Sequence, residues 1–488
     1  MLRNLLTRHH VPAVETSRLI VGSTGSGKSE GELADLIRLA GRGDHAVVLL
    51  DGHGPLAFAA AGHWAARGHE PRMVYESLDA TNRVLAWHML SRSADPDPVR
   101  RRLADAETRE DISQCFLAQR NLVTLADRPW TKEWLEAAID LCLAQPEPQP
   151  LTLLLTAFRV GTAAYERLLS QCECDEVAVK FRDLERIRRK NPVQYETLSG
   201  ASRRLLEAVC TSEVVRLRSR PGPFDWSAAL RERRLVAFDG GGVRSRETKR
   251  TLFLLVTMQV IHAVRRHFAE TRSALRTVLV LEEAGALGLV TPFVMSALQE
   301  LRKAGLSIHL ITQSSLDFGD QALFEAVLAN TAWQAWYQSL SPADQELGGR
   351  ALANPTFSPH AVHFTRERAL PGHGRSAPHG RFERVTDAYF KSPDLHAQEY
   401  RTRLATLRVG ERLVRDRGGV HLERLRPVRA PWFRRITDEQ TRAIITRIRR
   451  QPIYLPAPDP SPPPGASILP NAAERLRQRS QPPADVTA

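Results

Sequence analysis

Cysteine is scarce in this 488-residue sequence, and no long hydrophobic run occurs. The five cysteines are odd in number and form no Cys-x-x-Cys pair, which favours a reduced, cytosolic protein over a disulfide-stabilised one. No apolar stretch reaches the roughly eighteen residues of a transmembrane helix, and the N-terminal apolar stretch is too short for a signal peptide. We therefore expect a cytoplasmic protein with no transmembrane anchor of its own.

Acidic residues are fewer than basic ones: the sequence has 55 Asp and Glu and 68 Lys and Arg, which gives a formal net charge of +13. Arginine outnumbers lysine, and its guanidinium pairs with phosphate in a fork geometry. The excess suits a polyanionic partner such as DNA, and a codon bias toward arginine explains it equally well. With 42% hydrophobic and 25% charged residues, the chain is otherwise an ordinary globular protein long enough for two or three domains.

A phosphate-binding pattern stands near the N-terminus. The apolar segment Arg18–Val21 runs into Gly-Ser-Thr-Gly-Ser-Gly-Lys-Ser, which has the spacing of a P-loop. Glycines let backbone N–H groups approach an anion, and the helix expected from about Lys28 directs its positive dipole end to the same place. Lys28 can reach the β- and γ-phosphates, and Ser29 can ligate Mg²⁺. The alternative is a loop that binds nothing. We predict an ATP and Mg²⁺ site formed by Gly22, Ser23, Thr24, Gly25, Ser26, Gly27, Lys28 and Ser29.

The pattern of strands and helices predicts an α/β fold with a helical insertion. Apolar strand signals alternate with helical ones at both ends of the chain, which indicates a parallel sheet covered on both faces. Between about 81 and 221 almost no strand signal appears, and helical candidates follow one another. We expect an α/β core at residues 1–80 and 225–450, an inserted all-α domain at 81–224, paired late strands within 405–428, and a disordered Pro-rich tail at 451–488.

A P-loop needs a carboxylate for the metal and a group that activates the attacking water. The apolar strand expected at 277–281 ends in two acids, so we assign the metal-side role to Glu282 and the water-activating role to Glu283. Asp51 and Asp239 also close apolar strands and are rivals for the metal-side role. The pair at 282–283 is preferred because only it offers adjacent acids.

Two further polar residues are candidates for catalytic roles. Gln313 ends the strand expected at 307–313, where an amide can contact the γ-phosphate or the attacking water; a plain strand-end residue is the alternative. Arg302 lies near the end of the helix expected before that strand, which runs to about Ala304, and is a candidate arginine finger for the site of a neighbouring subunit. A solvated helix-end cation explains Arg302 equally well. Arg302 is preferred to Lys303 because a planar guanidinium suits a transferring phosphoryl group.

The motifs, taken in their order along the chain, resemble those of the FtsK–HerA superfamily of ring-forming P-loop motors. Within that superfamily they most resemble the coupling ATPases of conjugation and type IV secretion. The resemblance covers roughly residues 15–430. It implies a RecA-like P-loop NTPase core with an inserted all-α domain, a homohexamer with sites between subunits, and ATP-driven movement of DNA. It rests on residues 22–29, Asp51-Gly52-His53-Gly54, Leu279–Gly288, Arg302–Gln313 and Val409–Leu413.

The implied partners are DNA, further copies of the chain, and a relaxase, relaxosome component or secretion-channel protein. The sequence departs from the family pattern in two ways. It lacks the N-terminal transmembrane helices of membrane-anchored coupling proteins, so we expect it at the inner membrane only through partners. Glu282 stands where Asp is usual, which bears on the turnover rate.

Three functions are compatible with these patterns. The first is a hexameric ATPase that recruits or translocates DNA, as in conjugative transfer. The second is a HerA-like motor for DNA processing or phage defence, which needs no membrane anchor. The third is an ATP-gated adaptor that assembles on nucleotide and hardly hydrolyses it, for which Glu282 is the only support in the sequence.

Overall fold

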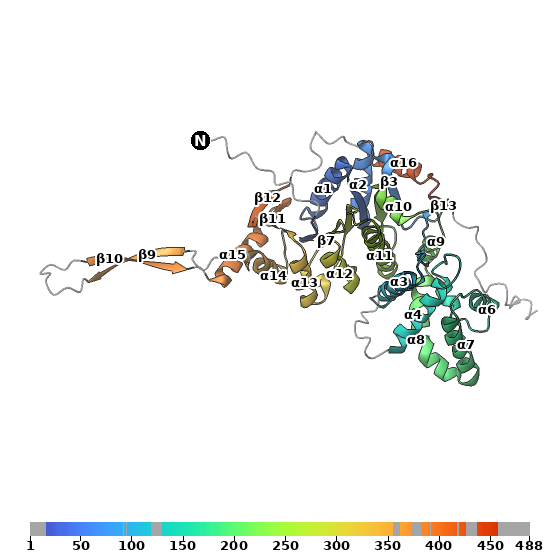
Figure 1. Ribbon diagram of the computed structural model, residues 1–488. Helices are drawn as coiled ribbons and strands as arrows, with labels where there is room; N and C mark the ends of the chain where they lie inside the picture. Colours follow the sequence, from blue (N-terminus) through green and yellow to red (C-terminus); the bar gives the residue numbers. More distant parts are fainter. Residues whose placement is uncertain are drawn as a thin grey trace, which may run out of the picture.

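A single sheet of nine strands forms the centre of the computed structural model (Figure 1). The structure describes residues 16–90, 92–93, 95–118, 129–354, 362–371, 382–390, 392–416, 419–425 and 437–456. The strand order is β12-β11-β8-β1-β7-β6-β2-β5-β3, in which β8 through β3 are parallel and β11 and β12 are antiparallel at one edge. The strands are β1 (Arg18–Val21), β2 (Ala46–Asp51), β3 (Met73–Ser77), β5 (Leu235–Asp239), β6 (Thr277–Leu281), β7 (Leu306–Thr312), β8 (Trp333–Tyr337), β11 (Glu411–Asp416) and β12 (Gly419–Arg424).

Helices cover both faces of this sheet. Every residue of β2 and β6 is buried, as expected of parallel strands with apolar side chains on both faces. One face carries α1 (Lys28–Arg42), α2 (Pro55–Ala66) and α16 (Asp438–Ile448), and the other carries α10 (Trp226–Arg231), α11 (Arg246–Thr271), α12 (Pro292–Glu300) and α13 (Gln321–Asn330) (Figure 1). The parallel sheet with helices on both faces was predicted correctly.

A helical segment is inserted between β4 (Arg83–Leu85) and β5, and it extends away from the sheet in Figure 1. The segment returns to the core through Arg218, which forms an ion pair of 2.6 Å with Glu76; both side chains are fully buried. Its helices are α3 (Pro98–Ala118), α4 (Pro129–Leu143), α5 (Leu153–Thr156), α6 (Ala163–Ser170), α7 (Asp175–Lys190), α8 (Pro192–Cys210) and α9 (Glu213–Arg218).

The C-terminal segment differs from the expected tail at its start. β13 (Tyr454–Pro456) pairs antiparallel with β4, which lies in a region with almost no strand signal in the sequence. Tyr454 is buried, and its hydroxyl accepts a hydrogen bond from the backbone of Tyr75 at 2.8 Å and donates one back at 2.8 Å. Burial of one aromatic side chain therefore orders a segment whose composition is Pro-rich. The rest of the expected tail and residues 1–15 lie outside the described residues.

A further segment connects β8 to β11. It consists of α14 (Pro342–Ala353), a β-hairpin of β9 (Val362–Pro371) and β10 (Phe382–Phe390), and α15 (Pro393–Thr406). The sequence pattern does not predict this hairpin, which extends away from the rest of the molecule in Figure 1. The paired late strands were predicted, and they are β11 and β12. Among the described residues, no helix combines the length and apolarity needed to cross a bilayer.

Candidate nucleotide-binding site

The P-loop joins β1 to α1 and has the backbone that its glycines permit. Gly25 and Gly27 have φ values of 79° and 99°, in the left-handed region that side chains with a Cβ seldom adopt. At Gly22 the constraint is space, because a Cβ there would lie 2.5 Å from the Cβ of Tyr337 on β8. The loop is therefore pressed against the neighbouring strand, with its backbone turned around a concave surface.

The atoms that would meet phosphate are available in this geometry. The N-cap of α1 is Gly27, with no side chain capping the helix, so the first N–H groups of α1 remain open to an anion. The Ser26 hydroxyl is buried with no hydrogen-bond partner among the described residues. The Lys28 ammonium donates to the carbonyl oxygens of Gly22 and Ser23, the latter at 2.9 Å. These unsatisfied or exchangeable donors fit a bound polyphosphate.

Burial lowers the pKa of Lys28, and the nearby Glu283 and Glu282 oppose this effect. A cation with two carboxylates close by is the charge arrangement expected beside a phosphate–metal site. Binding of a nucleotide phosphate would bring further negative charge to Lys28 and raise its pKa, so the ammonium form is favoured in the bound state.

Sheet order brings the P-loop and the acidic pair together. β7 lies between β1 and β6, so the carboxyl ends of three parallel strands meet at one edge. The Ser29 hydroxyl donates to Glu282 Oε1 at 3.2 Å, although the two residues are 253 positions apart. A hydroxyl and a carboxylate oxygen are ligands that Mg²⁺ accepts, directly or through water.

Gln313, at the end of β7, connects the two halves of the site. Its side-chain oxygen accepts a hydrogen bond of 2.7 Å from the Thr24 hydroxyl of the P-loop. Its amide nitrogen donates to Glu283 Oε1 at 2.7 Å. One amide thus touches both the P-loop and the acid assigned to water activation, and the contact of Gln313 with the γ-phosphate or the attacking water stays a prediction.

The rivals of Glu282 differ in position. Asp51 lies beside Glu282 because β2 pairs with β6, but its carboxylate accepts hydrogen bonds from the backbone N–H groups of His53 and Ala57 at 2.8 and 2.9 Å. It thereby caps the turn into α2. Asp239 is the last residue of β5, which is four strands from β1, or about 19 Å at the usual strand spacing. The geometry favours Glu282 over Asp239, with Asp51 as its buried neighbour.

Burial raises the pKa of Glu282 well above its usual range, and a hydrogen-bonding contact with Asp51 and the charges of Asp51 and Glu283 add to the shift. Its Oε2 atom is buried without a hydrogen-bond partner among the described residues. Three carboxylates packed together favour a proton on one of them until a cation arrives. This electrostatic state fits a site that takes up a metal ion together with its nucleotide.

The backbone of Glu283 is left-handed, with φ of 59°. This conformation is unfavourable for a residue with a Cβ and persists where the surroundings impose it, commonly at functional sites. The side chain is nearly buried and accepts from Gln313, while His53 Nε2 lies 3.5 Å from its Oε1 atom. His53 was part of a motif in the sequence analysis but had no role there; its proximity arises from the pairing of β2 with β6.

Arg302 is not part of the site in its own chain. It lies in the turn after α12, exposed to solvent, at the amino end of β7. The seven residues of β7 separate it from Gln313 by about 20 Å. A role for Arg302 in catalysis therefore requires the site of another subunit, and that role stays a prediction.

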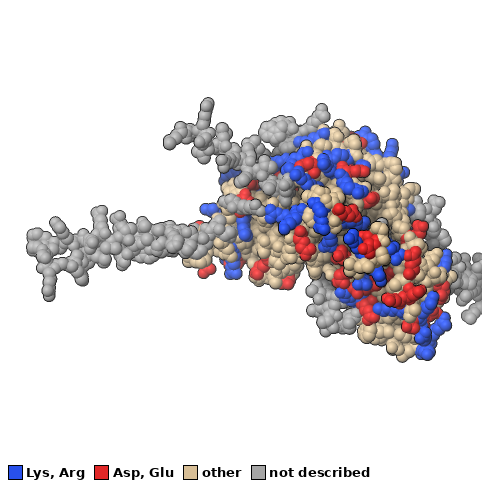
Figure 2. All heavy atoms as spheres, viewed as in Figure 1, with Lys and Arg blue, Asp and Glu red and all other residues tan. Residues whose placement is uncertain are grey.

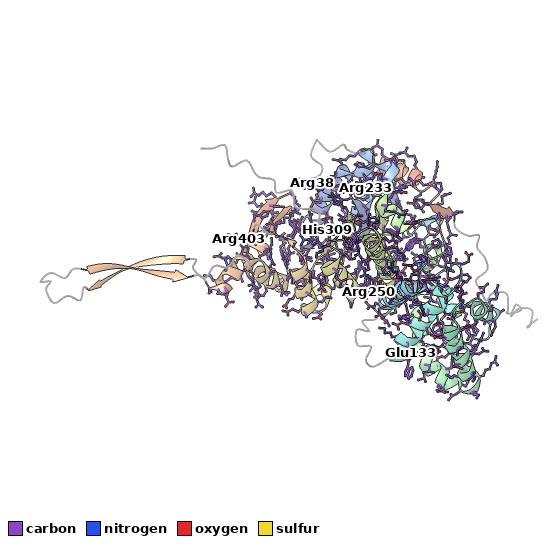
Figure 3. All side chains as sticks on the ribbon, in the orientation of Figure 1. Arg38, Glu133, Arg233, Arg250, His309 and Arg403 are labelled. Atoms are coloured by element: carbon purple, nitrogen blue, oxygen red, sulfur yellow. The ribbon has the colours of Figure 1, made fainter. Side chains whose placement is uncertain are left out.

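A buried ion pair and a buried hydrogen-bond contact hold α1 over the sheet. Arg18 on β1 is fully buried and lies 2.7 Å from Asp35, and His309 on β7 lies 2.8 Å from Glu32. Figure 3 labels His309 inside the body and Arg38, a second partner of Asp35 at 2.8 Å, above it. Because removing one partner of a buried pair is strongly destabilising, these contacts fix the direction of α1 and so of its N-terminus.

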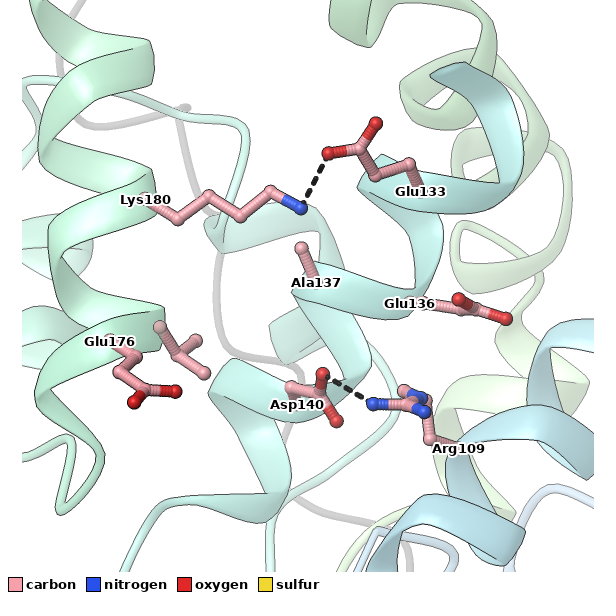
Figure 4. A pocket seen from close by; sticks show the side chains of 8 residues that line it. Arg109, Glu133, Glu136, Ala137, Asp140, Glu176 and Lys180 are labelled. Atoms are coloured by element: carbon pink, nitrogen blue, oxygen red, sulfur yellow. Dashed lines mark hydrogen bonds and ion pairs between the residues drawn. The ribbon is translucent and has the colours of Figure 1, made fainter. Parts of the chain in front are cut away.

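A pocket of about 300 Å³ lies in the helical insertion, between α3, α4 and α7 (Figure 4). Its cations are paired with its own acids: Lys180 lies 2.8 Å from Glu133, and Arg109 lies 3.1 Å from Asp140. None of the site residues predicted from the sequence lines it. These ion pairs neutralise both cations of the pocket, and we assign the pocket no ligand.

No protein-family model matches the sequence, and no curated protein sequence matches it. Solved structures do resemble the fold. The bacterial conjugative coupling protein TrwBdeltaN70, in a trigonal form with sulphate, superposes with a TM-score of 0.54 at 15% identity, covering 91% of this chain and 89% of that one. The plasmid coupling protein TrwB with ADP and Mg²⁺ gives a TM-score of 0.52 at 14% identity, covering 91% and 89%.

VirB4 of Thermoanaerobacter pseudethanolicus is similar at a TM-score of 0.50 and 15% identity, covering 85% of this chain and 90% of that one. Taken together with the strand order and the P-loop, these likenesses define the class: the chain has a RecA-like P-loop ATPase fold with an inserted helical segment. Within that class, the chain resembles the conjugative coupling protein TrwB and VirB4, and these likenesses confirm the predicted fold. At such low identity the likeness establishes the fold alone.

Proposed function

We propose that this protein is an ATP-hydrolysing ring motor that recruits or translocates DNA, as in conjugative transfer and type IV secretion coupling. The observation that supports hydrolysis is the placement of Gln313, hydrogen-bonded to Thr24 of the P-loop and to Glu283 at 2.7 Å each. A site that only held nucleotide would need no group joining the phosphate loop to a carboxylate suited to activate water.

In this proposal Gly22–Ser29 and the N-terminus of α1 bind the phosphates of ATP. Lys28 leaves the carbonyl oxygens that it now contacts and pairs with the β- and γ-phosphates. Ser29 and Glu282 hold Mg²⁺, directly or through water, with Asp51 as the neighbouring carboxylate. The bound metal would neutralise charge that develops on the phosphate oxygens. Glu282 must lose its proton when the metal binds, because burial and Asp51 favour the protonated acid beforehand.

Glu283 would accept hydrogen bonds from the attacking water and align it with the γ-phosphate, and Gln313 would hold Glu283 in that direction. Positioning of this kind supplies much of the catalysis of phosphoryl transfer. Arg302 would reach the nucleotide of an adjacent subunit and stabilise charge in the transition state. A closed ring with heterologous contacts supplies each site with one such residue.

DNA as the substrate is supported by charge. The chain carries a net charge of +13, and Figure 2 shows Lys and Arg side chains spread over the face of the core in that view, interspersed with fewer acids. Such a surface attracts a polyanion without reading its sequence. The likeness to coupling ATPases favours DNA, or a DNA–protein complex carrying a relaxase, as the transported substrate, and a secretion-channel protein as the route to the inner membrane.

The first test is ATP hydrolysis with and without single- and double-stranded DNA, for wild type, Lys28→Ala and Glu283→Gln. We expect hydrolysis that DNA stimulates and that both variants abolish. The Glu283→Gln variant keeps the shape of the side chain, so it should still bind ATP while turning it over at least about 100-fold more slowly.

The other outcomes separate the alternatives. If wild type hydrolyses ATP no faster than Glu283→Gln, the motor proposal is wrong and an ATP-gated adaptor replaces it. If hydrolysis is fast but indifferent to DNA, the proposed substrate is wrong. A HerA-like processing motor predicts stimulation by DNA ends, so linear and circular DNA of equal sequence should then differ.

A further inference from the structure

The segment between β8 and β11, residues 338–410, contacts the nucleotide site at both of its ends. At its start, Ser23 of the P-loop donates from its backbone to the Gln338 carbonyl at 3.0 Å, and its hydroxyl accepts from Leu340 N at 3.1 Å. At its end, Gly410 N donates to the Ser26 carbonyl at 3.0 Å. The two helices α14 and α15 inside this segment pack against each other. The segment is therefore hydrogen-bonded to the P-loop at both of its ends.

A third contact reaches the loop that carries Gln313. Asp344, in the first turn of α14, is only 2% exposed. Its carboxylate accepts hydrogen bonds from the Ser314 hydroxyl at 2.8 Å and from the Ser315 backbone N–H at 2.7 Å, and a further one from the Ser315 hydroxyl. These are the two residues that follow Gln313.

This use of Asp344 differs from the ordinary role of an acid at that helix position. An acid in the first turn usually faces solvent or caps its own helix, and here Ser341 already caps α14 by accepting from Asp344 N. The carboxylate of Asp344 instead accepts hydrogen bonds from the loop that follows β7. A buried carboxylate with three donors is a strong and directional contact. The loop is held from its other side by Asp317, which accepts from Ser314 N and from the Thr312 hydroxyl at 3.0 Å each.

We propose that Asp344 is a positioning residue for catalysis, which holds Gln313 against Glu283 and makes hydrolysis depend on the seating of α14 and the segment 338–410. This inference rests on the proposed function, since it assigns Gln313 a part in turnover. Asp344 touches neither nucleotide nor water and acts through Ser314 and Ser315. α15 leads from the hairpin β9–β10 back to the P-loop, and Figure 3 labels Arg403 of α15 between hairpin and body.

The test is a double-mutant cycle on kcat with Asp344→Asn, Gln313→Ala and the double variant. Asp344→Asn keeps the volume of the side chain but weakens its acceptance of hydrogen bonds. We expect Asp344→Asn alone to lower kcat about tenfold or more, as for other residues that orient a catalytic group, while the affinity for ADP stays within about threefold of wild type. In the Gln313→Ala background, Asp344→Asn should change kcat by less than about twofold.

Asp320→Asn is the matched control. Asp320 caps α13 by accepting from Ala322 N at 2.9 Å, lies in the same region, and contacts neither Ser314 nor Ser315. It should leave kcat unchanged. If Asp344→Asn and Gln313→Ala lower kcat independently, so that their effects multiply, the positioning role is refuted while the proposed function stands. If Gln313→Ala leaves kcat unchanged, the proposed role of Gln313 fails, and with it this inference.

Discussion

The left-handed backbone of Glu283 leads to a prediction in which two equally inactive variants differ in stability. A residue with a Cβ in this region costs about 1–2 kcal/mol relative to glycine. Glycine loses more backbone entropy on folding, by about 0.4–1 kcal/mol relative to alanine. The difference predicts that Glu283→Gly is more stable than Glu283→Ala by about 1 kcal/mol.

Comparison of these two variants isolates the effect of the backbone conformation on the free energy of unfolding. Both remove the carboxylate, so relief of its repulsion with Glu282 cancels, as does loss of the hydrogen bond from Gln313. Both should lose ATP hydrolysis to the same extent. The free energy of unfolding is measured by urea denaturation without nucleotide, followed by tryptophan fluorescence, and turnover is measured by phosphate release.

A site with an ordinary helical backbone provides the control with the opposite sign. Glu325 is exposed in the middle of α13, where alanine is favoured over glycine by about 1 kcal/mol. Glu325→Gly should therefore be less stable than Glu325→Ala. If Glu283→Ala equals or exceeds Glu283→Gly in stability while the Glu325 pair behaves as expected, the argument from strain at Glu283 is refuted.

Three other predictions concern single positions. Because burial and neighbouring acids raise the pKa of Glu282, the folded state holds a proton that the unfolded state releases above about pH 4.5, so this contribution to stability is lost as pH rises. Without Mg²⁺, Glu282→Gln should therefore gain stability over wild type as pH increases from 5 to about 9, measured by urea denaturation; a difference that is constant with pH would contradict this. Gly22→Ala should destabilise the fold by about 1–3 kcal/mol, since its Cβ would lie 2.5 Å from that of Tyr337, and unchanged thermal unfolding would show that β8 can yield. Arg302→Ala should lower DNA-stimulated turnover by about 10³-fold with ADP affinity unchanged. Mixing Arg302→Ala with the inactive Lys28→Ala variant should restore part of the activity, because mixed rings contain some sites that have both Lys28 and Arg302. If mixing restores no activity, Arg302 has no role in trans.

The sequence was sufficient for the P-loop because that site is local. In the proposed function, residues 22–29 would meet phosphate with consecutive backbone N–H groups and the start of one helix, so their order in the chain already specifies the geometry. Buried parallel strands were recognisable for a similar reason: burial on both faces requires an unbroken apolar run, as in β2 and β6. The strands of the hairpin β9–β10 have no such run, so the sequence did not predict them.

The remainder of the site depended on which strands are neighbours. Asp51, Asp239 and Glu282 all end apolar strands, and only the order of the sheet separates Glu282, beside Ser29, from Asp239, four strands from β1. The contact of Gln313 with Thr24, across 289 positions, follows from β7 pairing with β1.

Asp344 is the clearest example of a residue whose contacts the sequence could not predict. In the sequence it is an ordinary acid in the first turn of a helix, and only the folding of α14 onto the loop after β7 buries its carboxylate against Ser314 and Ser315. The sequence thus determined the long apolar strands and the P-loop pattern, where the physical cause lies within a few consecutive residues. Tertiary structure alone decided which distant acids and amides meet, because that depends on strand order and side-chain packing rather than on local pattern.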